Sequence, residues 1–212
     1  MKKYEFTGET RNFFGRTLNR IRALVEIRDH DSNVLVVQGD LGGWIEREDN
    51  LSHEDNAWVF NNAVVSGNAR VFGNASVCGD AIVSGNARVS GNAVVSDIAV
   101  VRGDAVVSDI AVVRGGAVVF GDARVCGNAE INKTTHFLTV SPIGSRNDIT
   151  TFFRTKDNII KVKCGCFLGT IPEFLSEVES THGNNKHATA YRLAVELAKE
   201  QIELDTADLE EK

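Results

Sequence analysis

The sequence predicts a mainly β protein whose central part is a parallel β-helix, and three observations lead to this prediction. Thirteen units of the form Asn/Asp-Ala-x-Val-x-Gly follow one another without insertion from position 56 to position 133. Every unit keeps its alanine and a β-branched residue two places later. The chain of 212 residues has 19 glycines but only two prolines, and nine of the glycines stand at the last position of a repeat unit.

The repeat explains how such a solenoid can form. Alanine and valine two residues apart point to the same side of a short strand, and the residues that flank valine point away. The Gly-Asn or Gly-Asp pair tolerates the positive φ that a corner requires. One strand of this length cannot bury its apolar side alone, so successive strands must coil and stack. Small alanine and larger valine in alternation fit the interior of a narrow triangular prism.

The spacing of these residues resembles that of the hexapeptide-repeat proteins, in which an aliphatic residue is followed four places later by a small one, as in Val65 to Ala69. The resemblance implies a left-handed coil with three units per turn. The position after the aliphatic residue departs from the family, because it is Ser, Phe, Cys or Arg here. An alternative remains open: residues 92–103 and 104–115 differ only at Asn92 and Asp104, which is also compatible with a flat solenoid of two units per turn.

With three units per turn, outward side chains form three columns. The first is aliphatic at every level, and consists of Val64, Ile82, Val100 and Val118. Such a stripe is an exposed patch that favours a partner, and three parallel prisms would bury it, as in trimeric hexapeptide-repeat proteins. We therefore expect a homotrimer, although β-branched residues also simply favour strands.

The other two columns are more polar. The second consists of Arg70, Arg88, Val106 and Arg124, and the third of Trp58, Ser76, Val94, Val112 and Glu130. The arginines have the chemistry to hold phosphates. Acidic residues balance the basic ones within the repeat, however, so a solvated face is favoured and nucleic acid is not an expected partner.

The chain is expected to have three parts. Residues 1–44 form an N-terminal cap, in which alternating apolar residues over 21–28 predict a strand and residues 34–37 its hairpin partner. The β-helix spans 45–133, with Ile45 and Leu51 in register with Ala57. Residues 134–212 form a small α+β domain with strands near 137–140, 150–153 and 159–163. A capping box at Thr170–Glu173 starts a helix that ends at Gly183, a second helix spans 185–204, and an acidic tail begins at Asp205.

Enzymatic activity is not expected. Hexapeptide-repeat acyltransferases need a histidine base between prisms, and related metalloenzymes need three histidines, but the thirteen repeats contain no histidine. No catalytic residue, cofactor or metal is therefore predicted. A zinc site from Cys164, Cys166, His182 and His187 is an alternative, disfavoured because zinc sites prefer wider cysteine spacing. The four cysteines and the lack of an apolar stretch of signal-peptide length at the start predict a cytoplasmic protein, and the lack of an apolar run of membrane-spanning length predicts no membrane contact. The net charge of −6 does not favour a polyanion as partner.

The best candidate binding site is a turn in the C-terminal domain. Its residues combine cations, small hydroxyls and turn amides, and they are Ser145, Arg146, Asn147, Asp148, Thr150, Arg154 and Lys156. Such groups can hold an anionic ligand or a phosphate. The alternative is an ordinary polar turn.

Four segments resemble a family of bacteriophage and prophage accessory proteins. They are residues 4–10 (YEFTGET), 39–45 (GDLGGWI), 142–148 (PIGSRND) and 164–167 (CGCF). The resemblance implies a phage origin and an accessory role, not a reaction. We therefore expect a non-enzymatic, oligomeric phage protein in the host cytoplasm that captures a host or defence component, such as a small phosphorylated ligand. A virion scaffold is the alternative, and acyltransfer is disfavoured.

Overall fold

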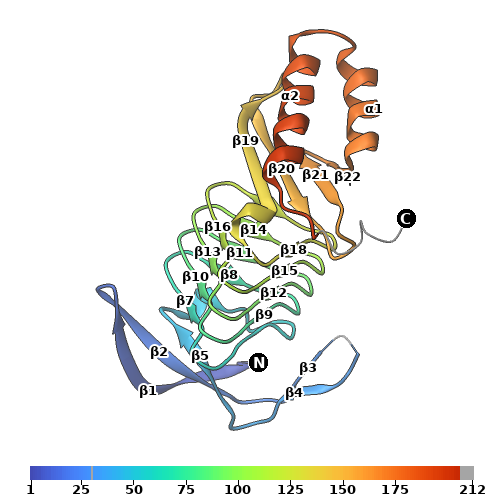
Figure 1. Cartoon of the computed structure of the whole chain (residues 1–212). Helices are drawn as coiled ribbons and strands as arrows, with labels where there is room; N and C mark the ends of the chain where they lie inside the picture. The colour runs from blue at the N-terminus through green and yellow to red at the C-terminus, as the bar shows by residue number, and fades with distance from the viewer. Residues whose placement is uncertain (30, 206–212) are drawn as a thin grey trace.

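The computed structural model describes residues 1–29 and 31–205, and it shows a β-solenoid of about five turns with two C-terminal helices. N-terminal strands lie at one end of the solenoid, and a sheet with two helices lies at the other (Figure 1). The acidic tail expected after Asp205 falls outside the described residues. Within 1–29 and 31–205, neither helix is long and apolar enough to cross a bilayer.

The solenoid has three parallel sheets, which we name by their outward residues. The aliphatic face consists of β7 (Val64–Val65), β10 (Ile82–Val83), β13 (Val100–Val101) and β16 (Val118–Val119), and it continues β5 (Leu41–Ile45). The arginine face consists of β8 (Arg70–Val71), β11 (Arg88–Val89), β14 (Val106–Val107) and β17 (Arg124–Val125). The third face consists of β6 (Trp58–Val59), β9 (Ser76–Val77), β12 (Val94–Val95), β15 (Val112–Val113) and β18 (Glu130–Ile131).

Strands that pair within a face are three units apart in the sequence. Ile82 pairs with both Val64 and Val100, and Arg88 pairs with Arg70. The predicted columns are therefore confirmed, and the solenoid of two units per turn is wrong because it would have stacked Ile98 on Ile110. The alanine and valine of each unit fill the interior, where nearly all of them are completely buried.

The corners require residues in the left-handed region. Gly79 has a φ of 69°, and a Cβ there would lie 2.8 Å from the carbonyl oxygen of Asp97. Asp97 and Asp109 occupy equivalent corners with φ of 58° and 62°. Their carboxylates accept hydrogen bonds from the amides of Gly115 and Gly127, one turn further along, at 2.9 and 2.8 Å. These bonds help to offset the strain that a residue with a Cβ experiences at such corners.

The first turn of the solenoid is longer than the others. Ile45 pairs with Val65 and Leu51 with Val71, so each of these pairs spans two more positions than the pair of Trp58 with Ser76. The expectation that Ile45 and Leu51 share the register of Ala57 is therefore wrong. Both side chains are larger than alanine and stack on valines instead, because two extra residues are accommodated between Leu51 and Trp58.

The N-terminal strands differ in part from the prediction. β1 (Tyr4–Phe13) and β2 (Arg16–Ala23) form a hairpin through Phe14 and Gly15, both with positive φ. β2 also pairs with β5 and so extends the sheet of the aliphatic face. Only β3 (Ile27–Arg28) pairs with β4 (Val34–Val36), so the single strand expected over 21–28 is divided between two pairings.

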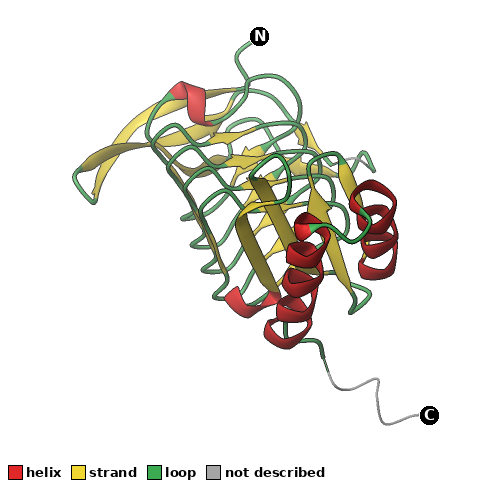
Figure 2. Cartoon of the chain, turned by 90° about the horizontal axis from the view of Figure 1, so that it is seen from above, coloured by secondary structure: helices red, strands yellow, loops and turns green. Residues whose placement is uncertain are grey.

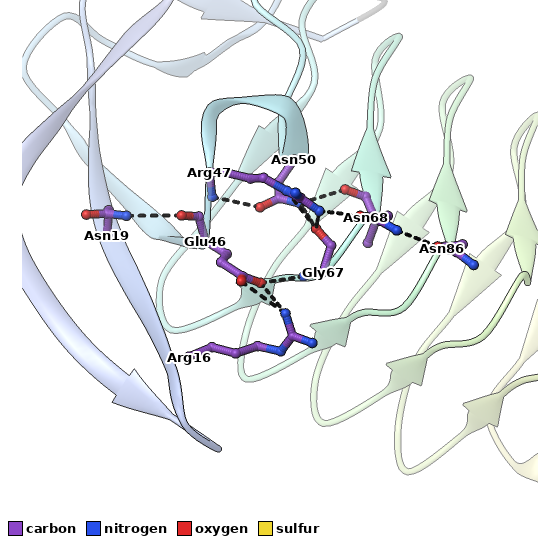
Figure 3. A network of polar contacts seen from close by, with 9 residues as sticks. Arg16, Asn19, Glu46, Arg47, Asn50, Gly67, Asn68 and Asn86 are labelled. Atoms are coloured by element: carbon purple, nitrogen blue, oxygen red, sulfur yellow. Dashed lines mark hydrogen bonds and ion pairs between the residues drawn. The ribbon is translucent and has the colours of Figure 1, made fainter.

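A polar network joins this hairpin to the solenoid (Figure 3). The Glu46 carboxylate accepts a hydrogen bond from the Gly67 amide at 2.6 Å and forms an ion pair with Arg16 at 2.8 Å. Burial raises the pKa of this carboxyl, but the amide and the guanidinium together outweigh burial and lower it. Beside it, the side-chain amide of Asn50 donates a hydrogen bond to the carbonyl of Ala69 at 2.8 Å. These contacts satisfy polar groups at the start of the coil.

The C-terminal domain is a four-stranded antiparallel sheet with two helices. Its strands, in spatial order, are β19 (Phe137–Ile143), β20 (Asp148–Arg154), β21 (Ile160–Cys164) and β22 (Phe167–Thr170). The helices are α1 (Ile171–His182) and α2 (Lys186–Gln201), and two short 3-10 turns occupy Glu48–Asn50 and Thr134–His136. The capping box at Thr170 and the end of α1 at Gly183 are confirmed; β22 was not predicted.

Strand β20 belongs to two cores. Phe153 is fully buried in the hydrophobic core of the solenoid, whereas Phe152 is fully buried in the core of the helices. Thr155 forms an antiparallel bridge with Ala129, and the Thr151 hydroxyl accepts a hydrogen bond from the Arg124 amide at 3.0 Å. Viewed from above, the C-terminal sheet and helices lie over the solenoid (Figure 2).

Candidate functional site

The strongest candidate site is a cleft at the end of the C-terminal sheet that lies away from the Ala129–Thr155 bridge. Two β-turns meet there, one between β19 and β20 and the other between β21 and β22, together with the end of α1. The cleft has a volume of about 290 Å³, at the lower end of the range for small-molecule sites. It is lined by Ser145, Arg146, Asp148, Cys164, Gly165, Cys166, Phe167, Phe174, Glu177, Val178, Thr181, His182 and Tyr191.

The Tyr191 side chain packs directly against the β19–β20 turn at Gly144. A Cβ at Gly144, which has a φ of 75°, would lie only 1.9 Å from the tyrosine hydroxyl oxygen, so glycine is required there. The Cys164 thiol donates a hydrogen bond to that hydroxyl at 3.7 Å. Burial first, and the hydrogen bond with Cys164 second, raise the pKa of Tyr191 to about 12. The phenol is therefore protonated near neutral pH and can itself donate a hydrogen bond.

Four rings form a continuous row along the cleft. The centroids of Phe167 and Phe174 are 5.4 Å apart, and those of Phe174 and Tyr191 are also 5.4 Å apart. His182 stacks on Tyr191 at 5.8 Å with an interplanar angle of 28°. Phe174 and Tyr191 are buried, whereas Phe167 and His182 remain partly exposed. The row therefore offers an aromatic wall to a ligand.

The rim carries charges of both signs. Arg146 is exposed and makes no hydrogen bond or ion pair with any residue that the structure describes. One oxygen of Asp148 accepts a hydrogen bond from the Ile149 amide at 2.8 Å, and one oxygen of Glu177 accepts from the Thr181 hydroxyl at 3.3 Å. Among the described residues, each carboxylate thus keeps one oxygen available, and the guanidinium is available as a whole.

The predicted site residues divide between the two ends of β20. Ser145, Arg146 and Asp148 line the cleft, and Asn147 lies in the same turn with a φ of 51°. Thr150 is completely buried within the strand.

The two remaining cations lie at the opposite end of the strand. Arg154 is 5% exposed, contacts the His136 ring nitrogen Nδ1 at 3.3 Å, and forms an ion pair with Asp205. Lys156 is exposed, and its amide donates to the carbonyl of Asn128 at 3.0 Å. Since the seven residues of β20 span about 20 Å, neither cation reaches the ligand that Arg146 would bind.

Sequence reasoning missed most of the opposite wall of the cleft. In the sequence, the Cys164–Phe167 segment contributes only to the family resemblance and to the disfavoured zinc site, and Tyr191 falls within the helix expected over 185–204 without a role in a binding site. The signal that was available is the pair of Gly-containing turns, which an antiparallel sheet brings to one edge. Cys164, Cys166 and His182 line the same cleft, but the residues described include no group of three or more His, Cys, Asp or Glu side chains arranged to hold a metal ion.

The four side chains predicted to form the oligomer interface on the aliphatic face differ in how exposed they are. Val64 is only 2% exposed because it packs with Leu18 of β2 and with Trp44. Ile82, Val100 and Val118 are half-buried, and Ile98 at the adjoining corner is 65% exposed. Ile82 still packs against the cluster of Leu18, Trp44 and Val64, so the part of the stripe away from that cluster consists of Val100 and Val118.

Comparison with known proteins does not identify a relative. No protein-family model matches the sequence, and no curated protein matches it. Function therefore has to be inferred from the fold and from the chemistry of the cleft.

Proposed function

We propose that the chain is a non-enzymatic, oligomeric binding protein, encoded by a phage and acting in the host cytoplasm, whose C-terminal cleft captures a small phosphorylated ligand. The observation that carries the proposal is Arg146, which has no partner among the described residues and lies at the mouth of a cleft made by two turns. A guanidinium binds phosphate oxygens through two parallel hydrogen bonds.

The turn itself adds donors beside that guanidinium. The amides of Ser145 and Arg146 make no hydrogen bond with the part of the chain that the structure describes, and Ser145 lines the cleft. Successive free amides in a turn form a concave site for anions. Capture of a host or defence component of this chemistry would fit a phage accessory protein.

Self-association is the second part of the proposal. The aliphatic face and the third face meet at the corner of Ile98, and Val94 and Val112 extend the apolar surface onto the third face. The arginine face lies on the remaining side. Two adjacent apolar faces suit a closed ring in which each copy contacts two neighbours. We propose a left-handed coil and a parallel homotrimer, as in the hexapeptide-repeat resemblance.

Native mass spectrometry of the full chain, purified from bacterial cells, tests both parts. We expect a trimer that carries the additional mass of a small phosphorylated molecule. Arg146→Ala should lose that mass. Lys156→Ala is the matched control, because it removes an exposed cation just beyond the opposite end of the same strand.

Each of the other outcomes would contradict one part of the proposal. A monomer would overturn the trimer, and a ligand that Arg146→Ala retains would overturn the site. A trimer that carries no ligand, together with copies of the protein in purified phage particles, would instead favour the virion scaffold.

A further inference from the structure

The cleft contains more than a phosphate needs. A phosphate or a sugar phosphate would use Arg146 and the turn amides, but it would gain nothing from a row of four rings and would lose water against it. Aromatic side chains that line a site gain energy when a flat ring stacks on them. Phe167 and His182 are the partly exposed members of the row, so a planar group of the ligand would lie against one of them.

The two carboxylates impose a second requirement. Asp148 and Glu177 repel a phosphate, so the groups that face them must be hydrogen-bond donors. Each carboxylate has one oxygen that accepts no hydrogen bond from the described residues. An amino group or ring N–H on the ligand, or a pair of sugar hydroxyls, would satisfy these oxygens.

We propose, on the basis of the proposed function, that the ligand is a nucleoside monophosphate. The phosphate lies at Arg146 and the free amides of Ser145 and Arg146. The base lies along the aromatic row, and its N–H donors or the ribose hydroxyls face Asp148 and Glu177. A cleft of about 290 Å³ suits one nucleotide rather than a dinucleotide.

Isothermal titration calorimetry on the full chain, freed of any ligand by unfolding and refolding, tests this assignment. The probes are the four common ribonucleoside monophosphates, ribose 5-phosphate and inorganic phosphate. We expect at least one nucleotide to bind about ten times tighter than ribose 5-phosphate, or more, because stacking of a base on an aromatic side chain contributes a factor of that order.

Single-residue variants separate the contributions of ring and charge. Phe167→Leu and His182→Leu each remove one of the two partly exposed rings, and at least one of them should weaken nucleotide binding about tenfold while leaving ribose 5-phosphate unchanged. Asp148→Asn is nearly isosteric and changes a group on the rim, so it should fold as the parent does and weaken nucleotide binding by a similar factor. Lys156→Ala is again the control and should bind as the parent chain does.

The rate of cysteine alkylation reports independently on where the nucleotide binds. Cys166 is exposed and lines the cleft, whereas Cys78 lies in the solenoid. A bound nucleotide should slow alkylation of Cys166 at least several-fold and leave that of Cys78 unchanged. Equal affinity for ribose 5-phosphate and for every nucleotide would overturn this inference alone. If none of the probes binds, the phosphate site and the proposed function fall with it.

Discussion

The solenoid and the C-terminal cleft are built on opposite principles. In the solenoid, each side chain packs on the equivalent residues one turn before and one turn after it, so a single repeated motif specifies the environment of every position. In the cleft, Arg146, Cys166 and Tyr191 come from two turns and a helix and have no repeated environment. A repeat thus makes architecture predictable, while an irregular domain built on the end of the repeat is left free to carry a specific site.

The largest expected effect tests whether inward-facing and outward-facing positions of the repeat differ in their contribution to stability. Val89 is completely buried between turns, and the adjacent Arg88 points outward. Val89→Asp places a charge in the dry interior and should lower the free energy of unfolding by about 4 kcal/mol or more. Arg88→Asp, the matched control, should stay within about 0.5 kcal/mol of the parent. Urea unfolding followed by circular dichroism measures both, and equal losses would mean that inward and outward positions are not distinct.

The next largest effect tests whether the two cores that share β20, that of the solenoid and that of the C-terminal domain, respond separately to substitution. Phe153→Ala and Phe152→Ala should each cost about 3–5 kcal/mol, since both rings are completely buried. Hydrogen exchange with mass spectrometry should show faster exchange in the last solenoid turns for Phe153→Ala, and in α2 for Phe152→Ala. The same exchange pattern for both variants would show that the solenoid and the domain unfold as one unit.

A smaller effect concerns the support of the cleft. Gly144→Ala places a Cβ against the Tyr191 hydroxyl in a left-handed turn, and should cost about 2–4 kcal/mol from overpacking and backbone strain together. Adding Tyr191→Leu shortens the opposing side chain and should recover part of the loss. Thermal unfolding of the two single variants and the double variant measures this coupling, and strict additivity would argue against the contact.

The smallest effect is a pH dependence at the other end of the molecule. The pKa of Glu46 is lowered from 4.5 in the folded chain, so its contribution to stability is present above about pH 4.5 and is lost as the pH falls through the lowered value. Glu46→Gln should therefore destabilise the protein near neutral pH but have little effect once the carboxyl is protonated in acid. Urea midpoints under the two conditions test this, with Glu9→Gln on the exposed surface as the control.

Periodicity explains which parts of the fold the sequence could predict. The three columns, the capping box at Thr170 and the helix end at Gly183 depend on local spacing, and the structure contains all of them. The first turn could not be placed, because an insertion of two residues after Leu51 shifts the register without a local signal. The β1–β2 hairpin was missed because its turn is Phe14-Gly15 rather than a pair that signals a turn strongly.

The candidate cleft could be predicted only in part. The residues around Arg146 are expected from the sequence to form a candidate anion site, but Arg154 was grouped with them because it is near in sequence. An extended strand carries it to the other end of the sheet, where it pairs with Asp205. The opposite wall, which includes Cys166 and Tyr191, depends on how three strands and two helices pack, and no short spacing encodes that.

The three-unit turn also determines what a duplication does to the molecule. The near-identical segments 92–103 and 104–115 are each two units long, which is two-thirds of a rotation about the coil axis. Equivalent residues of the two segments therefore face different directions: Val94 lies on the third face, while its counterpart Val106 interrupts the arginines of the neighbouring face. Each gain or loss of such a segment would swing the C-terminal cleft around the axis relative to the N-terminal hairpin. Gain or loss of a whole turn of three units would change only the distance of the cleft from the hairpin along the axis, whereas gain or loss of a two-unit segment would also change the direction in which the cleft faces.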